Sequence, residues 1–275
     1  MNVCLENVNM QSNSGPNYFA QKLVKYMGLR GTTFESNLRY NVKLTFIESQ
    51  GLQPTLPMVQ RLDGIYFNAN FDCDKMNYNI RKTYDAAKGV VFQTNFNKDL
   101  IFNWFGPHDN YRVINNGSDV LNIRTTRQGF QEYTKKYDNI WSCAAHWHSF
   151  KRLKSNIEYF LNYSQDNDCL LIAGPNPDEI VNHPRIFYVG TLNSDVVIDA
   201  RACGCRIICS SSGGTKEISG KNAIVIQEPD WDFSFIDQTN PPILDYDKKL
   251  ENGQDSAISM AKTAKNYEEF LKRMI

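Results

Sequence analysis

The chain has 275 residues, with 30 lysines and arginines against 30 aspartates and glutamates, so its formal net charge is zero. This balance excludes a global electrostatic attraction to nucleic acid or to an anionic membrane. Its 41% hydrophobic and 22% charged residues are typical of a globular protein with one large or two small domains.

The N-terminal residues and the cysteines indicate the cellular compartment of the protein. Residues 1–6 (MNVCLE) contain neither the basic region nor the long apolar region of a signal peptide, and no apolar run is long enough to span a bilayer. The seven cysteines are an odd number and include no CxxC pair, which argues against a disulfide framework or a zinc site. We therefore expect a cytoplasmic protein with reduced thiols and no membrane span.

The first part of the chain alternates predicted strands and helices, the pattern of a parallel sheet. A loop of small and polar residues, 10–17, contains Gly15 and joins the first strand to the first helix. The expected strands cover residues 2–7, 42–48, 57–67, 89–93 and 112–117, and the expected helices cover residues 18–27, 79–87 and 97–105.

Two opposite charges, Arg61 and Asp63, stand at the end of the third predicted strand. In open α/β sheets, ligands bind at the carboxyl ends of the strands, so the pair is a candidate for substrate contact. An ion pair that only closes a turn explains the same residues.

A polar connector is expected at residues 119–138, and a second α/β series follows it. A basic turn at residues 146–154, which contains Lys151, separates a strand from a helix. It is suited to neutralise a diphosphate, or else it is a solvated face that caps the helix. His146 and His148, two residues apart, do not make a convincing metal pair. The expected strands cover residues 140–145, 169–174, 185–190 and 206–209, and the expected helices cover residues 155–163 and 199–204.

The stretch at residues 194–226 reads as helix, strand, glycine loop and helix. Gly213 and Gly214 allow a ligand to approach the main chain, and a helix that opens at Thr215 has free N–H groups that attract anions. Asp199, a strand's length earlier, is placed to hold ribose hydroxyls. The alternative is a turn that binds nothing.

Several segments, taken in order, resemble the donor-binding domain of retaining glycosyltransferases with two Rossmann domains (GT-B), specifically glycosyltransferase family four. Residues 197–208 (VIDARACGCRII) are similar to that family's EAMACG-x-PVI element, and residues 213–218 (GGTKEI) to its GG-x-P-E. The matches follow the family's order over about two-thirds of the chain. Three more segments carry the resemblance: residues 113–119 (VINNGSD), with the I-x-NG-x-D pattern of the domain junction; residues 150–152 (FKR), with the phosphate-binding lysine; and residues 171–175 (LIAGP), with the strand that ends in G-x-GP.

The resemblance implies a site in a cleft between the two domains, with no metal. The implied donor-binding residues are Gly15, His146, Lys151, Val189, Asp199, Gly213, Gly214, Thr215 and Glu217, and the implied catalytic residues are Arg61, Asp63 and Lys151.

The sequence departs from the family at functional positions. Asp199 replaces the ribose-binding glutamate and is one methylene shorter, and His146 replaces a phosphate-binding arginine, so it carries charge only when protonated. Asp63 aligns with a histidine near the sugar. Residues 191–195 are shorter than the family's segment with a further glutamate. We therefore expect sugar selection to differ from the family norm.

The resulting expectation is a retaining transferase that moves a sugar from a nucleotide diphosphate sugar, its co-substrate, to an acceptor hydroxyl without a metal or other cofactor. The leaving phosphate, held by Lys151 and the glycine loop, would assist the incoming hydroxyl. The segment at residues 66–78 (YFNANFDCDKMNY) can stack on sugar rings or on flipped bases, which leaves a glycan, a small molecule or a modified nucleic-acid base as acceptor.

Other functions stay open at this level. Asp72 and Asp74 have the DxD spacing with which single-domain glycosyltransferases bind a divalent ion. A non-catalytic protein that binds a nucleotide or sugar would share the same motifs. A dinucleotide-dependent oxidoreductase is disfavoured, because no GxGxxG follows a predicted strand.

The predicted architecture is α/β, with two Rossmann-like domains that face each other across a cleft: an acceptor domain at residues 1–136 and a donor domain at residues 137–258. The resemblance implies that a terminal helix at residues 259–275 crosses back to the first domain, whereas a helix that covers only the second domain is the alternative. A helical stripe of apolar residues supports such a helix: Ile258, Ala261, Ala264, Tyr267, Phe270, Leu271 and Ile275.

Overall fold

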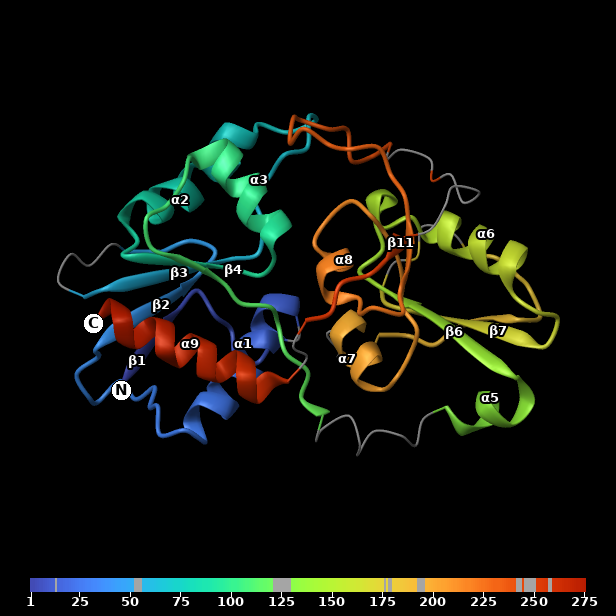
Figure 1. Cartoon of the computed structure of the whole chain (residues 1–275), viewed down its shortest axis with the longest axis horizontal. Helices are drawn as coiled ribbons and strands as arrows, with labels where there is room; N and C mark the ends of the chain where they lie inside the picture. Colours follow the sequence, from blue (N-terminus) through green and yellow to red (C-terminus); the bar gives the residue numbers. More distant parts are fainter. Residues whose placement is uncertain are drawn as a thin grey trace.

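The protein is described by a computed structural model that covers residues 1–12, 14–51, 56–120, 130–175, 177, 180–191, 196–240, 244, 251–256 and 259–275. The chain forms two α/β halves side by side (Figure 1). Among the described residues, no helix is both long enough and apolar enough to cross a membrane.

The first half is a five-stranded parallel sheet with the strand order β1-β2-β3-β4-β5. Its helices cover both faces, with α1 and α9 on one side and α2 and α3 on the other (Figure 1). The elements are β1 (Val3–Glu6), α1 (Gly15–Gly28), β2 (Val42–Phe46), β3 (Met58–Leu62), α2 (Cys73–Ala86), β4 (Gly89–Phe92), α3 (Asn95–Phe105) and β5 (Tyr111–Val113).

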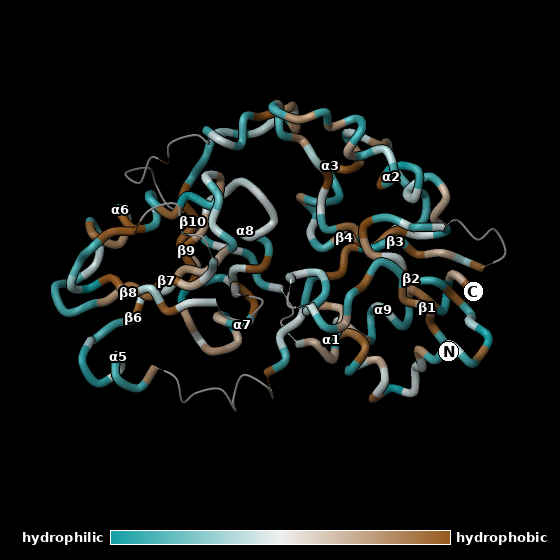
Figure 2. Tube along the Cα trace, turned by 180° about the vertical axis from the view of Figure 1, so that it is seen from behind, coloured by the Kyte–Doolittle hydropathy of each residue, from teal (hydrophilic) through white to brown (hydrophobic). Residues whose placement is uncertain are grey.

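The central strands are covered on both faces of the sheet. Every residue of β2, β3 and β4 is buried, but only β4 (GVVF) is a continuous apolar run: β2 (VKLTF) alternates apolar and polar residues, and β3 (MVQRL) contains Gln60 and Arg61. Figure 2 shows the hydrophobic segments along these strands, inside the layers of helices. The buried side of this sheet therefore includes polar residues, such as Arg61, that need partners inside the protein.

The second half contains separate small sheets. The strands β6 (Asn139–Ala144), β7 (Asp168–Ala173) and β8 (Ile186–Tyr188) form a parallel sheet covered by α5 (Gln131–Lys136) and α6 (Leu153–Tyr163). The strands β9 (Ile208–Ser210) and β10 (Ile224–Ile226) are parallel, and β11 (Glu251–Asn252) joins them antiparallel. The short helices are η1 (Ser149–Lys151), α7 (Val196–Ala202) and α8 (Thr215–Ile218).

This arrangement differs in detail from the predicted one. The strand expected at residues 206–209 lies in the β9-β10-β11 sheet, apart from β6-β7-β8. The helix expected from residue 79 begins at Cys73, because Asp72 caps it. In α5, the ring of Tyr133 packs against that of Phe187 in the second half, with 5.0 Å between ring centres. Residues 121–129 of the connector, residues 192–195 and Ile258 lie outside the described part of the chain.

The terminal helix α9 (Met260–Met274) packs on the first half, as the resemblance implied. Its buried residues Tyr267 and Leu271 belong to the same core as Phe19 of α1 and Phe46 of β2. The chain leaves the first half beside the start of α9: a Cβ at Gly117 would lie 2.5 Å from Cα of Met260, so only glycine fits there.

Candidate functional site

The glycine loop lies where the sequence predicted it, between β9 and α8. Gly213 has φ of +94°, a conformation that favours glycine, and a Cβ there would meet no atom within 4 Å. Gly214 has an ordinary φ of −76°, but a Cβ there would lie 2.6 Å from Oγ1 of Thr94 in the first half. The two glycines therefore have different roles: Gly213 shapes the loop, and Gly214 lets it approach the other half.

The basic turn follows β6, at the carboxyl edge of its sheet. Lys151 ends the short helix η1, and its ammonium lies 5.2 Å from the centre of the Phe150 ring. Among the described residues, no carboxylate or carbonyl binds this ammonium. The protein atoms around it disfavour the charged form and lower the pKa of Lys151, although part of the side chain is exposed. An anionic ligand would compensate this unpaired charge.

The histidines of this turn form an exposed stack. The ring centres of His146 and His148 are 4.8 Å apart at 12° between planes, and His148 stacks on Phe150 at 5.5 Å. Between them, Trp147 is buried and donates from Nε1 to the carbonyl of Ala173 at 3.0 Å. The buried tryptophan thus fixes the turn while both imidazoles remain accessible.

A bridge through Glu228, which follows β10, joins the basic turn to the glycine loop. The guanidinium of Arg152, the residue after Lys151, pairs with the Glu228 carboxylate. The backbone N–H of Glu228 donates to Oγ of Ser211 at 2.8 Å, at the start of the glycine loop. Segments about sixty residues apart, both predicted to bind phosphate, are therefore held together at one edge.

In the first half, Arg61 and Asp63 form an ion pair at the end of β3. The Arg61 side chain is 1% exposed; its guanidinium lies 4.2 Å from the centre of the Phe19 ring and donates to Oδ1 of Asn116 at 3.1 Å. This burial shows that Arg61 positions its partner and does not itself face solvent. Close to it, burial raises the pKa of Tyr267 to about 12.

Asp63 is more accessible, with 21% of its side chain exposed. Its Oδ1 accepts hydrogen bonds from Arg61 and from Nε2 of Gln93, whereas no described residue binds its Oδ2. Gln93 follows β4 and was not predicted as a site residue. Only its place at the carboxyl end of the neighbouring strand could have indicated it.

The candidate residues of the two halves meet at the N-terminus of α3. Thr94, next to Gln93, caps α3 by accepting from N–H of Asn97 and touches Gly214. The Glu217 carboxylate accepts from the backbone N–H groups of Asn95 and Phe96, each at 2.7 Å. A carboxylate at the positive end of a helix is electrostatically favoured. In this structure Glu217 is therefore bound to protein.

The remaining predicted donor residues are spread around this edge. Asp199 lies in α7 and is only 9% exposed. Thr215 begins α8, which is a single turn of four residues. Val189 follows β8 and donates its N–H to the carbonyl of Ile172 at 2.9 Å. Gly15 begins α1 beside open space. No described contact joins Gly15 or Val189 directly to the glycine loop.

Two features lie outside this cluster. Asp72 caps α2, accepting from N–H of Lys75 at 3.1 Å, and Asp74 lies in the first helical turn, so the DxD spacing has a structural explanation. Within the described ranges, no group of three or more His, Cys, Asp or Glu side chains is arranged to hold a metal ion.

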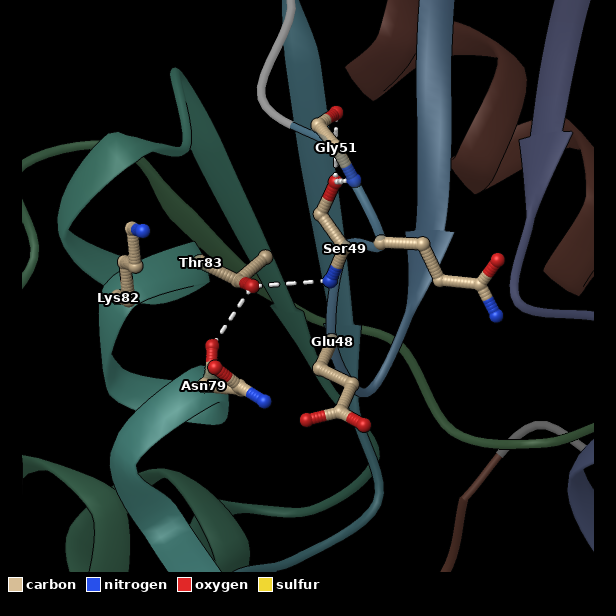
Figure 3. A pocket seen from close by; sticks show the side chains of 7 residues that line it. Glu48, Ser49, Gly51, Asn79, Lys82 and Thr83 are labelled. Carbon is tan, nitrogen blue, oxygen red and sulfur yellow. Dashed lines mark hydrogen bonds between the residues drawn. The ribbon is translucent and has the colours of Figure 1, made fainter.

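A cavity of about 300 Å³ lies between α2 and the chain that follows β2 (Figure 3). None of the predicted site residues lines it; its lining residues are Glu48, Ser49, Gln50, Gly51, Asn79, Lys82 and Thr83.

Solved structures resemble the chain over its whole length. Anabaena HepE, crystallised with UDP and glucose, matches with a TM-score of 0.66 at 11% identity over 99% of this chain and 100% of that one. The protein has the GT-B fold. Sucrose-phosphate synthase from Thermosynechococcus elongatus matches with a TM-score of 0.61 at 10% identity, over 100% and 97% of the chains.

A third GT-B structure extends the likeness. WaaG, described as a glycosyltransferase involved in lipopolysaccharide biosynthesis, matches with a TM-score of 0.56 at 10% identity over 98% of this chain and 90% of that one. No protein-family profile and no curated protein sequence matches the chain. The likeness therefore concerns the fold, and the chemistry has to be argued from the site.

Proposed function

We propose that the protein transfers a sugar from a nucleoside diphosphate sugar to a hydroxyl group of an acceptor. The observation that carries this proposal is the contact of Gly214 with Thr94, because it sets the glycine loop of one half opposite the Asp63 cluster of the other. The GT-B fold, shared with a protein crystallised with UDP and glucose, supports the choice of donor.

The diphosphate binds between the basic turn and the glycine loop. Lys151 supplies an unpaired cation, and the open space at Gly213 admits phosphate oxygens close to the main chain. His146 adds a second positive charge when it is protonated. The almost completely buried Asp199 accepts hydrogen bonds from the ribose hydroxyls.

The sugar lies toward the first half, against Asp63. Arg61 and Gln93 fix Oδ1 of Asp63, so Oδ2 is available to accept from a sugar hydroxyl. Because the buried cation fixes the carboxylate in advance, the sugar of the donor is held in one orientation relative to the acceptor. Gly15, at the N-terminus of α1, contributes backbone N–H groups to the same cleft.

The reaction proceeds with retention and without a metal in this proposal. As the bond from the anomeric carbon to the diphosphate breaks, the departing phosphate oxygen accepts the proton of the incoming hydroxyl on the same face. Lys151 and the loop stabilise the charge that develops on the phosphate. No protein nucleophile is then required. In the same proposal, the reaction takes place in the cytoplasm.

A screen of UDP-, GDP-, ADP- and dTDP-sugars tests the function, with release of the nucleoside diphosphate as the readout. We expect one donor class to be turned over, and the anomeric configuration of the product, read by NMR, to match that of the donor. Tight nucleotide binding without turnover against an acceptor library would favour the non-catalytic alternative. Absence of both binding and turnover would exclude the proposal.

A further inference from the structure

A strap from the second half reaches across to the first. This strap, residues 228–240, starts at Glu228, which pairs with Arg152, and its later part returns to the basic turn, where Oγ of Ser149 donates to the carbonyl of Gln238 at 3.3 Å. Figure 1 shows it as an arc above the space between the halves. Both of its ends are therefore anchored beside the predicted phosphate site.

The strap is firmly attached to the first half. Asn68 and Ile236 form a parallel bridge, and the N–H of Ala69 donates to the carbonyl of Ile236 at 2.8 Å. Nε1 of Trp104 donates to the carbonyl of Phe233 at 2.8 Å, and Phe233 has a φ of 63°, which is unusual for a bulky residue. A strained residue persists where the surrounding contacts fix it, so the strap has a defined shape.

The aromatic side chains of the strap divide into anchors and exposed groups. Trp231 packs on Phe67 at 4.7 Å and on Phe96 at 6.1 Å between ring centres. Phe235 meets the ring of Trp104 edge-on at 4.7 Å but is still 52% exposed, and Phe71, three residues after the bridge, is 58% exposed. Because the N–H of Phe96 also binds Glu217, this aromatic surface borders the candidate site.

Charge limits what this surface can bind. The strap contains three exposed carboxylates, Asp230, Asp232 and Asp237, and no lysine or arginine; its fourth carboxylate, Glu228, is paired with Arg152. Residues 66–78 add Asp72 and Asp74 against Lys75 alone. Hydrogen bonds to Thr239 and other neighbours hold the pKa of the exposed Asp237 below its usual value. A phosphodiester backbone would be repelled from such a face.

We propose that the strap and residues 66–72 form the acceptor surface, and that it binds an uncharged saccharide chain. The inference rests on the proposed function. Exposed aromatic rings stack on the apolar faces of sugars. Between them, Asn70 donates from Nδ2 to Oδ1 of Asp237 at 2.7 Å, and the remaining oxygens of this amide and carboxylate can accept from hydroxyl groups. A modified nucleic acid, one of the acceptors left open by the sequence, is disfavoured by the same carboxylates.

Binding to immobilised probes tests this surface. The probes are maltohexaose, cellohexaose and N-acetylchitohexaose, a heparin hexasaccharide, a lysine-rich peptide and a short DNA duplex, each at low and high NaCl concentration. We expect retention by at least one neutral oligosaccharide at both salt concentrations. Retention only by DNA, heparin or the cationic peptide, lost at high salt, would overturn the inference.

Variants locate the binding. Phe71→Ala and Phe235→Ala should each weaken neutral oligosaccharide binding roughly five- to tenfold, as expected for a lost stacking contact. Tyr163→Ala, which removes a 43% exposed ring on α6, is the control and should change nothing. Phe71 has no described ring partner, so its removal leaves packing intact, and thermal unfolding verifies this.

Nucleotide binding separates the two proposals. UDP affinity, measured by calorimetry, should be equal in the wild type and in the Phe71 and Phe235 variants. If the wild type binds nucleotide but no neutral oligosaccharide, the acceptor surface is wrong and the proposed function stands. If it binds no nucleotide of any class, the proposed function itself fails.

Discussion

Gly214 lies so close to Thr94 that a Cβ atom on the glycine would come within 2.6 Å of Oγ1 and 2.8 Å of Cγ2 of the threonine. The contact joins residues of different halves, so it depends on how the halves approach one another. The glycine is needed for this approach, since its own φ of −76° suits any residue.

Gly214→Ala should therefore reduce sugar transfer strongly and leave nucleotide binding by the second half within a few-fold of wild type. The second-site change Thr94→Gly should restore transfer, because it removes the clashing atoms, and glycine at a helix N-cap costs only a few tenths of a kcal/mol relative to threonine. Steady-state kinetics of both variants check this. Failure of the double variant to recover would mean that the loop contacts the donor, not Thr94, at this position.

Lys151→Ala should weaken nucleotide-sugar binding by about 1.5–3 kcal/mol, the range for a lost hydrogen bond to a charged group. Lys154→Ala, three residues later in the first turn of α6, is the matched control. Equal affinities for wild type and Lys151→Ala by calorimetry, with the variant folded, would remove Lys151 from the site.

The pKa of Lys151 also predicts a pH dependence. Because burial lowers it from 10.5, the ammonium loses its charge at lower pH than an ordinary lysine does. A phosphate group needs the charged form, so the affinity for the donor nucleotide should fall as pH rises through the alkaline range below 10.5. Lys151→Arg should keep its affinity over the same range, since arginine stays charged. Parallel loss in both proteins would point to another titrating group.

Glu217 offers a choice between two roles that measurements can separate. If its main role is to bind the N-terminus of α3, Glu217→Ala should lower the free energy of unfolding by about 1–3 kcal/mol and affect nucleotide affinity little. Glu217→Gln should restore part of the stability, because the amide oxygen still accepts hydrogen bonds. Unchanged stability together with a large loss of donor affinity would instead support the donor role implied by the sequence.

Leu271→Ala tests the crossing helix. Leu271 is fully buried in the core shared by α9, α1 and β2, so the variant should lose about 2–5 kcal/mol of stability. Exposed Lys265→Ala on the same helix serves as the control. Denaturant unfolding followed by tryptophan fluorescence gives the values. A loss below 1 kcal/mol, about the cost of trimming an exposed side chain, would show that α9 is not part of this core.

The alternative roles of Asp72, as the N-cap of α2 or as a metal ligand of a DxD motif, can be tested by substitution. Asp72→Ala should destabilise the protein by about 0.5–2 kcal/mol through loss of the α2 N-cap, whereas Asp72→Asn should be nearly neutral. Turnover should be the same with EDTA and with Mg²⁺ or Mn²⁺. Activity that requires a metal and disappears in Asp72→Asn would favour the metal-dependent alternative.

The sequence predicted features whose causes are local. Short segments of sequence determine the buried strands, the glycine loop and the amphipathic stripe of α9. Each of these features lies close to its expected position. Gly213 could be assigned to a turn because it lies between a predicted strand and a predicted helix, and its φ of +94° agrees with that assignment. The packing of α9 on the first half came from the family resemblance, because a stripe of apolar residues does not say which surface it covers.

Features that depend on contacts between distant residues were missed. The alternation of Trp231, Phe233 and Phe235 resembles that of a strand, yet their partners, Phe67, Phe96 and Trp104, lie in the other half. Nothing in the sequence indicated that Glu217 binds the N–H groups of Asn95 and Phe96, which lie more than a hundred residues earlier. Gln93 has no motif and is recognised only through its hydrogen bond to Asp63.

The close fit at Gly117 has a mechanical consequence. The chain passes from the first half to the second just after Gly117 and returns just before Met260, and the two passages are joined by a bridge between Ser118 and Ser259 and by the N–H of Met260 donating to the carbonyl of Ser118 at 3.1 Å. Paired crossings at one point act as a single hinge, which permits rotation and resists separation. Opening for donor entry would then swing the glycine loop away from Thr94 about that axis, and the strap, attached on the far side, would set how wide the opening becomes.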